Sequence, residues 1–266
     1  MAKIDNFEID TIYNEDCLEG MKRIPDGSVD AIICDLPYGT TACAWDNIIP
    51  FEPLWKQYKR IIKPTSPIVL FSQQPFTSAL IMSNLEMWKY NWIWQKDNGS
   101  NFLNANHQPL KITEDICVFG NGATTESKKG VYMAYNPQMR KGFNPYKCKS
   151  GSQRKDTAMV RGVCKAQNGG VLTESGGNRF PVNILQFDRD SERLHPTQKP
   201  LDLIRYLILT YTKEGDTILD NCIGSGTTAI ACIKEKRHFI GFELNKEYYD
   251  KATYRVKMEQ AQLSLF

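Results

Sequence analysis

The sequence DTILDNCIGSGTTAIA, residues 216–231, has the pattern of a buried strand, a glycine loop and the start of a helix. Its first residues are largely apolar, and Gly224 and Gly226 interrupt the run before a second apolar segment begins. A further apolar segment at 238–242 ends at Glu243, nineteen positions after Gly224. A glycine-rich turn followed about twenty residues later by an acid is how a βαβ unit holds a ribose. This stretch therefore predicts an α/β fold with a site for a ribose-containing cofactor.

The glycine loop differs from two common phosphate-binding patterns. It lacks the full Gly-x-Gly-x-x-Gly spacing of dinucleotide sites, and it has no lysine of the kind that a P-loop nucleotide hydrolase requires. Asp220, immediately before the loop, would repel a pyrophosphate and attract a cationic amino group. The loop therefore favours a cofactor with a positively charged amino group, and a nicotinamide dinucleotide is the weaker alternative.

A second apolar run, residues 29–34, ends in Asp35-Leu36-Pro37-Tyr38-Gly39. The length and β-branched content of the run suit a buried strand, and Pro37 fixes the turn that follows. The turn presents a carboxylate beside an aromatic ring, and such a pair can hold a flat, hydrogen-bonding ring such as a nucleobase. Taken alone, the same residues also fit an ordinary exit from a strand.

Strand and helix patterns alternate over much of the remaining chain. Further strands are expected near 11–14, 67–71, 90–94, 115–119 and 180–185, and helices near 53–63, 74–85 and 201–212. Residues 98–106 are polar and lack a regular period, so we expect a loop there. The alternation predicts a Rossmann-like, mostly parallel and doubly wound sheet with helices on both faces.

Two further segments place polar residues at helix starts. Asp16 stands between an expected strand and a helical turn, a position that faces ligands in open α/β sheets and that is also a common N-cap. His195-Pro196-Thr197-Gln198-Lys199-Pro200 precedes the helix expected at 201–212 and holds Thr197 and Lys199 near its positive N-terminus. That position suits an anionic group, although the segment also fits a plainly capped helix.

The composition is that of an ordinary globular protein. With 266 residues, the chain can form one large domain, or one domain with a sizeable insertion. No apolar run is long enough to span a membrane and the N-terminus lacks the apolar core of a signal peptide, so we expect a cytoplasmic protein. The 8 cysteines include no Cys-x-x-Cys pair and there are 3 histidines, so neither a metal site nor a disulfide framework is expected.

The middle of the chain is basic and irregular. Residues 121–180 contain eleven lysines and arginines against three acids, a net charge of +8, so the remainder carries −5 because the whole chain carries +3. Tyrosines and phenylalanines are interleaved with these basic residues, as expected where bases stack and phosphates are attracted. The segment therefore predicts a surface that faces a polyanion, with a solvated loop as the alternative.

Four motifs in this order resemble the amino-group DNA methyltransferases that use S-adenosylmethionine. They are Asp35-Leu36-Pro37-Tyr38, the segment 195–200, the glycine loop 220–228 and Phe242-Glu243-Leu244-Asn245. With the catalytic motif first and the cofactor loop last, the chain resembles the β-arrangement of that family over almost its whole length. The resemblance implies a catalytic half at 1–120, a target-recognition insertion at 121–180 and a cofactor-binding half at 181–266, the two halves forming one α/β domain.

The resemblance also assigns expected roles to individual residues. The side chain of Asp35 and the backbone carbonyl of Leu36 would accept the two amino hydrogens of a flipped-out base, Pro37 would fix the turn and Tyr38 would stack on the base. The family most often has proline where Leu36 stands, but a leucine still supplies the carbonyl. The residues expected around the cofactor are Asp16, Cys17, Thr197, Lys199, Pro200, Asp220, Gly224, Ser225, Gly226, Thr227, Glu243 and Asn245. Those expected to bind double-stranded DNA are Arg140, Lys141, Lys147, Arg154, Lys155 and Arg161.

The implied activity is methylation of adenine N6, as in restriction–modification systems. N4-methylation of cytosine is the alternative within the family, although its enzymes usually carry serine where Asp35 stands. A C5-cytosine enzyme would need a cysteine nucleophile, commonly in a Pro-Cys pair, and the sequence has no such pair. Two alternatives from other classes are a nicotinamide-dependent oxidoreductase, which leaves Asp220 and the proline turn unexplained, and a catalytically silent DNA-binding module. The recognised DNA sequence, a partner endonuclease and a homodimer are left open.

Overall fold

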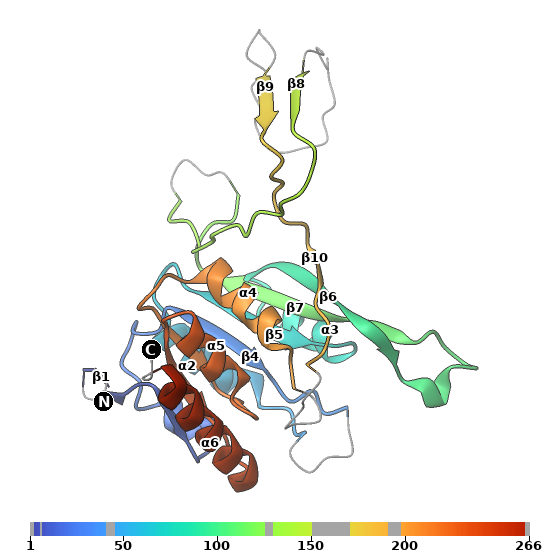
Figure 1. Cartoon of the computed structure of the whole chain (residues 1–266). Coiled ribbons are helices and arrows are strands. Elements are labelled where there is room, and N and C mark those ends of the chain that lie inside the picture. The colour runs from blue at the N-terminus through green and yellow to red at the C-terminus, as the bar shows by residue number, and fades with distance from the viewer. Residues whose placement is uncertain are drawn as a thin grey trace. The chain divides into compact units, whose positions relative to one another are not determined.

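An eight-stranded sheet forms the centre of the molecule in the computed structural model, which describes residues 3–5, 7–40, 46–125, 130–150, 171–190 and 198–263. Its strands are, in spatial order, β10 (Ile184–Gln186), β6 (Trp88–Ser100), β7 (Lys111–Gly120), β5 (Pro67–Ser72), β4 (Ala31–Asp35), β11 (Thr217–Asp220), β12 (His238–Phe242) and β3 (Thr11–Tyr13) (Figure 1). β7 runs antiparallel to β5 and β6, and the other neighbouring pairs are parallel. The predicted mostly parallel, Rossmann-like sheet is confirmed.

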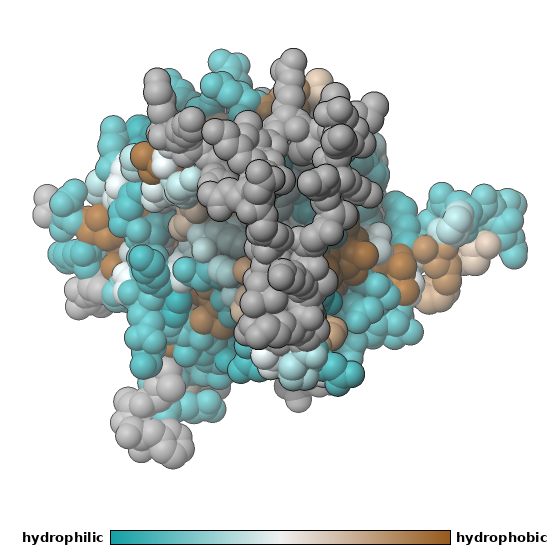
Figure 2. Space-filling model, turned by 90° about the horizontal axis from the view of Figure 1, so that it is seen from above, coloured by the Kyte–Doolittle hydropathy of each residue, from teal (hydrophilic) through white to brown (hydrophobic). Residues whose placement is uncertain are grey.

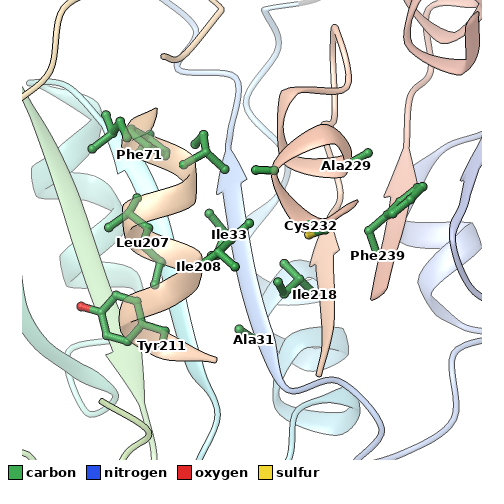
Figure 3. Close-up of a cluster of buried hydrophobic side chains, with 14 of the residues drawn as sticks. Ala31, Ile33, Phe71, Leu207, Ile208, Tyr211, Ile218, Ala229, Cys232 and Phe239 are labelled. Atoms are coloured by element: carbon green, nitrogen blue, oxygen red, sulfur yellow. The ribbon is translucent and has the colours of Figure 1, made fainter. Parts of the chain in front are cut away.

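Helices cover both faces of this sheet. They are α1 (Cys17–Met21), α2 (Phe51–Ile61) and α3 (Phe76–Ser83) on one face, and α4 (Leu201–Tyr211), α5 (Thr227–Lys234) and α6 (Lys246–Leu263) on the other. β4 shows why two hydrophobic cores form, because successive residues of a strand point to opposite faces. Ala31 and Ile33 join the core under α4 and α5, whereas Ile32 and Cys34 join the core under α1 and α2. Figure 3 shows the first of these cores, with Ile33 close to Leu207 and Ile208.

Two expected boundaries differ in the structure. β6 continues to Ser100 and a 3₁₀ turn, η1 (Phe102–Asn104), follows, so part of the loop expected at 98–106 is regular structure. The outer part of β6 pairs with β7 but has no core beneath it, so it carries no apolar period that the sequence could reveal. The strand expected at 180–185 is β10, which starts at Ile184. Pro181 lacks the N–H that a strand pairing would use.

The chain divides into two compact units, Met1–Asn136 with Asn183–Phe266, and Pro137–Val182. In the first unit, β1 (Lys3–Ile4) and β2 (Phe7–Glu8) form a small antiparallel pair. The second contains the antiparallel strands β8 (Tyr146–Ser150) and β9 (Val171–Ser175), so the insertion is not wholly irregular. Residues 121–136, which were expected to belong to the insertion, are counted with the sheet because Ala123 pairs with Tyr132 and Ala134 bonds to Thr65. In the described part of the chain, no helix is long and apolar enough to cross a membrane.

Candidate active site

The two motif strands are neighbours in the sheet. β4 and β11 pair in parallel, with Ile218 opposite Ala31 and Leu219 opposite Ile32. β12 pairs in parallel with β11 on its other side, so Asp35, Asp220 and Glu243 all follow or end strands at the same carboxyl edge. The fold that the family resemblance implies makes these two strands sheet neighbours, and the structure confirms it. Ligands bind at this edge in open α/β sheets, so it is the candidate active site.

The Asp35 turn brings an acid and an aromatic ring together. The Tyr38 hydroxyl donates a hydrogen bond of 2.6 Å to Asp35 Oδ1, and the Tyr38 ring stacks on Phe76 with centroids 5.3 Å apart. The side chain of Leu36 is buried in the core under α1 and α2. Position 36 therefore offers the site its backbone, because its side chain is used for packing.

A buried aspartate that the sequence patterns did not single out holds the same turn. Asp46 Oδ1 accepts from the backbone N–H groups of Tyr38 at 2.7 Å and Gly39 at 2.9 Å, and Oδ2 accepts from Thr40 at 2.9 Å. Gly39 has a φ of +66°, in the left-handed region that favours glycine. Because backbone donors carry no side-chain signature, the sequence contains no sign that Asp46 anchors the turn.

Lys199 contacts Asp35 directly. Its Nζ donates a hydrogen bond of 2.6 Å to Asp35 Oδ2 and lies 3.3 Å from Glu114 Oε2, an ion pair without hydrogen-bond geometry. Glu114 also pairs with Lys96, so four charges of alternating sign are linked. The sequence patterns placed Lys199 with the cofactor and did not single out Glu114 or Lys96, since nothing in their local sequence relates them to Asp35.

This charge network is largely withdrawn from solvent. Lys199 is only 7% exposed. Burial alone would lower the pKa of its ammonium, but the carboxylates of Asp35 and Glu114 outweigh burial and raise that pKa. Burial raises the pKa of Asp35, and the neighbouring Lys199 opposes the rise. The arrangement leaves Asp35 as a desolvated carboxylate with two donors, able to accept from a ligand that displaces one of them.

The glycine loop is tied to the acid at the end of β12. Gly224 and Gly226 have φ values of +53° and +80°, which explains glycine at both positions. The N–H of Gly224 donates 3.0 Å to Glu243 Oε2, and the N–H of Asn245 donates 2.8 Å to Oε1. Burial raises the pKa of the Glu243 carboxyl. The predicted glycine loop and the predicted acid are thus in direct contact.

Asp220 is buried beneath this loop. Its carboxylate accepts from the backbone N–H of Cys222 at 3.1 Å and from the Thr228 hydroxyl at 2.6 Å. Burial raises the pKa of Asp220 to about 6, against the opposing effect of these two donors. Asp220 therefore holds the loop against the first turn of α5.

Other residues expected around the cofactor have structural partners in the same region. Asp16 caps α1 by accepting from Leu18 at 2.8 Å, and Asn245 caps α6 by accepting from Glu247 at 2.9 Å. Cys17 is buried beneath the edge, and Pro200 directly precedes α4. The hydroxyls of Ser225 and Thr227 lie 3.3 Å apart, and Thr227 also accepts from Arg255 at 3.1 Å. Thr197 lies outside the described residues.

The residues expected to bind DNA fall in the second unit. Arg140 is structurally engaged, because its Nε donates 3.2 Å to the carbonyl of Phe180 and its guanidinium lies 5.1 Å from the centre of the Phe143 ring. Lys141 is exposed. Lys147 belongs to β8, of which only the backbone is described, and Arg154, Lys155 and Arg161 lie outside the described residues.

Among the described residues, no cluster of three or more His, Cys, Asp or Glu side chains could hold a metal ion.

The sequence has clear relatives. A family model described as DNA methylase, with N6 and N4 methyltransferases in its name, matches residues 29–254. The Type II methyltransferase M.HinfI of Haemophilus influenzae is 27% identical over 281 residues, covering 94% of this chain and 68% of the relative. The Type II methyltransferase M.HindIII of Haemophilus influenzae strain Rd is 26% identical over 311 residues, covering 95% and 96%.

Solved structures with the same fold include two methyltransferases. The complex of M1.HpyAVI with SAM superposes with a TM-score of 0.59 at 24% identity, covering 92% of this chain and 98% of the other. The cytosine-N4-specific PvuII DNA methyltransferase superposes with a TM-score of 0.63 at 15% identity, covering 92% and 85%. At these identities the likeness concerns the fold alone.

Proposed function

The chain belongs to the N6/N4 DNA methylase family, and on that basis we propose that it transfers a methyl group from S-adenosylmethionine to N6 of an adenine flipped out of double-stranded DNA. The observation that carries the proposal is the pairing of β4 with β11. It places the Asp35 turn and the glycine loop at the same edge of the sheet, where a methyl donor and an acceptor base can meet.

The residues around the glycine loop fit S-adenosylmethionine. A Cβ built on Gly224 would have no neighbour closer than the Cys222 carbonyl at 3.9 Å, so the loop faces open space there. Glu243 would accept from the ribose hydroxyls, and the charge of Asp220 would favour the positive amino group. When bound, the cofactor supplies a methyl group on a positively charged sulfur.

Asp35 and the carbonyl of Leu36 act on the acceptor amine. The lone pair of an adenine amino group is delocalised into its ring, and acceptors on its two hydrogens favour a pyramidal, nucleophilic nitrogen. These hydrogen bonds strengthen as positive charge develops on that nitrogen, so they stabilise the transition state more than the ground state. The raised pKa of Asp35 makes its carboxylate a stronger proton acceptor in this role.

Entry of the base rearranges the donors around Asp35. Tyr38 and Lys199 occupy the two oxygens of that carboxylate in the structure. An amino hydrogen takes the place of the Tyr38 hydroxyl, since Lys199 is buried and also paired with Glu114. Tyr38, which is half-buried, is then released to stack on the base, and this stacking partly offsets the cost of flipping the base.

Adenine is favoured over cytosine because an aspartate opens the turn. N4-cytosine enzymes of this family usually have serine at that position, and a serine hydroxyl is a neutral and weaker acceptor than a carboxylate. The likeness to the N4-specific PvuII enzyme does not oppose the assignment, because it is a likeness of fold.

Product analysis tests this function. The purified protein is incubated with unmethylated plasmid DNA and S-adenosylmethionine, and the digested nucleosides are identified by mass spectrometry. N6-methyladenine is expected, and sequencing of the modified DNA then gives the recognised site. N4-methylcytosine would overturn the choice of adenine, and the absence of any methylated nucleoside would overturn the proposed activity.

A further inference from the structure

The β6–β7 hairpin extends well past the catalytic edge. Asp35 pairs with Phe71 of β5, Phe71 pairs with Ile116 of β7, and Ile116 pairs with Trp92 of β6. Trp92 therefore lies at the same level of the sheet as Asp35. β6 is parallel to β4 and continues to Ser100, eight residues further. Ser100 pairs with Lys111, which is five residues of β7 from Ile116, because β6 has a register irregularity between Gln95 and Ser100. At about 3.3 Å per residue, the paired part of the hairpin reaches up to about 17 Å beyond the level of Asp35 (Figure 1).

The end of this hairpin is apolar and exposed. We call residues 101–110 the hairpin tip. Phe102 is 67% exposed and Leu103 is 99% exposed, although large hydrophobic side chains are the residues that folding usually buries. Figure 2 shows brown, hydrophobic surface on the projecting hairpin among hydrophilic neighbours. Two adjacent exposed apolar side chains at the end of a projection form a candidate contact surface.

Local hydrogen bonds hold the hairpin tip in one conformation. The N–H of Asn104 donates 3.1 Å to the carbonyl of Asn101, and the N–H of Ala105 donates 3.1 Å to that of Phe102. The Asn104 amide donates 2.8 Å to the Asn101 side chain. At the base of the hairpin, Asp97 pairs with Arg189 at 2.8 Å. Phe102 and Leu103 are therefore presented by an ordered turn, which reduces the entropy lost on binding.

The surroundings of the two apolar residues suit DNA. No acidic residue occurs from Asn98 to Thr113, and the segment carries a lysine and a histidine. Its polar side chains are mainly amides, which can bond base edges in either groove. They are Asn98, Asn101, Asn104, Asn106 and Gln108. β7 is the second strand from β4 and β6 is the third, so at ordinary strand spacing they lie about 10 and 14 Å from β4. These distances are comparable with the width of a major groove, about 12 Å.

We propose that Phe102 and Leu103 form a wedge that inserts into the base stack of the bound duplex beside the flipped base. The proposal rests on the DNA methyltransferase function proposed above. Apolar side chains inserted between base steps unstack and bend DNA, and an opened stack lowers the cost of extruding the target base. The hairpin tip would thus act on the duplex while Asp35, at the same edge, receives the base.

The test compares two duplexes that contain the site methylated by the unaltered protein on plasmid DNA. One is fully paired, and the other lacks the base opposite the target, so that the target is already unpaired. The double variant Phe102→Ala/Leu103→Ala is compared with the wild type and with Leu85→Ala. Leu85 is 55% exposed and lies just before β6 begins, at the opposite edge of the sheet.

The wedge predicts a loss that depends on the DNA substrate. For the double variant, kcat/KM on the paired duplex should fall about tenfold or more, and on the unpaired target it should return to within about twofold of the wild type. Leu85→Ala should match the wild type on both. Equal rates for the double variant and the wild type, or an equal loss on both duplexes, would overturn the proposed wedge. Either result would leave the proposed methyltransferase function standing.

Two accompanying measurements distinguish the wedge from a dimer contact and from a defect in folding. An equal loss of activity together with dissociation of a dimer in sedimentation would assign the hairpin tip to a contact between two copies of the chain. Thermal unfolding of the double variant should match that of the wild type, because both side chains are exposed. Absence of methylation by the unaltered protein itself would overturn the proposed function and the wedge together.

Discussion

At the scale of single residues, the neighbours of Asp35 determine how readily its carboxyl group ionises. Its carboxylate is desolvated, and the ammonium of Lys199 is the group that favours its ionised form. Glu114 and Lys96 extend the network, so removing one member leaves another charge buried without compensation. Individual side chains at this edge should therefore have separable effects on catalysis, titration and stability.

The first effect concerns the acceptor for the amino group. Asp35→Ala should lower the rate of methyl transfer by about a hundredfold or more, because a transition-state acceptor is lost. Cofactor affinity, measured by titration calorimetry, should stay within about threefold, since Asp35 is not part of the glycine loop. Asp35→Asn, which preserves the size of the side chain, is the matched control for packing. A comparable loss of cofactor affinity would contradict the assigned role.

The second effect concerns Lys199. Replacing Lys199 by methionine removes the charge that favours ionised Asp35, so the pKa of Asp35 should rise further and the acidic limb of the pH profile of kcat/KM should move to higher pH. Lys199→Arg keeps the charge and should restore the position of the limb. An unmoved limb in the methionine variant would show that Lys199 does not set the titration of Asp35.

The third effect concerns the buried Asp220. Its pKa is raised to about 6 in the folded protein from an ordinary 3.8, so the folded state binds its proton more tightly and stability is lost as pH rises through that interval. Asp220→Asn does not titrate. Relative to the wild type, its free energy of unfolding should therefore increase by about 1–2 kcal/mol between pH 5 and pH 8, measured by urea denaturation. A constant difference across this range would contradict the raised pKa.

At the scale of elements, the start of α5 must approach α6 closely. Gly226 is the N-cap of α5 and has a positive φ, and a Cβ built on it would lie 3.2 Å from the Cβ of Ala252. The same turn positions the N–H of Gly224 that bonds to Glu243. Both the positive φ and the close packing against α6 therefore favour glycine at position 226, which also borders the candidate cofactor site.

Gly226→Ala should therefore act on stability and on binding together. We expect about 1–2 kcal/mol of destabilisation from the left-handed φ alone, together with a loss of affinity for S-adenosylmethionine. Gly215→Ala is the matched control, because Gly215 has a φ of +83° with open space around it and lies before β11, away from the loop. It should lose similar stability without losing affinity. Equal affinities of the two variants for S-adenosylmethionine would show that the close packing at Gly226 does not affect cofactor binding.

At the scale of the whole molecule, positive charge is concentrated in the insertion and negative charge in the rest of the chain. We propose that the unit Pro137–Val182 contributes to DNA binding through its basic residues. Arg140 has a structural role there, since it bonds to Phe180 and lies over Phe143. It is therefore a poor position at which to test binding.

Salt dependence tests this contribution. Alanine at Lys141, Arg154 and Lys155 should reduce the slope of log affinity for duplex DNA against log salt by up to about 3, or about 0.9 for each phosphate that is no longer neutralised. The matched control replaces three exposed lysines of the sheet unit by alanine, namely Lys56, Lys59 and Lys257. If both triple variants changed the slope equally, DNA affinity would depend on the total charge of the protein, and the proposed contribution of this unit would be contradicted.

Much of the sheet could be predicted from the sequence, because strands buried on both faces are continuous apolar runs. The adjacency of β4 and β11 was implied by the fold of the family that the chain resembles, and it is present in the structure. The outer hairpin could not be predicted, since its strands pair without a core beneath them. The contacts of Asp46 and Glu114 depend on how the backbone folds back, and local sequence does not encode that path.

The edge strand β3 has a consequence for how such a protein can be encoded. β3 lies early in the chain but pairs in parallel with β12, and the C-terminal helix α6 packs against it. A link from α6 back to β3, with new ends opened inside the insertion, would produce a circular permutation that keeps all eight strands in place. The order of the catalytic and cofactor halves along a gene is therefore free to reverse without any change in the sheet that unites them.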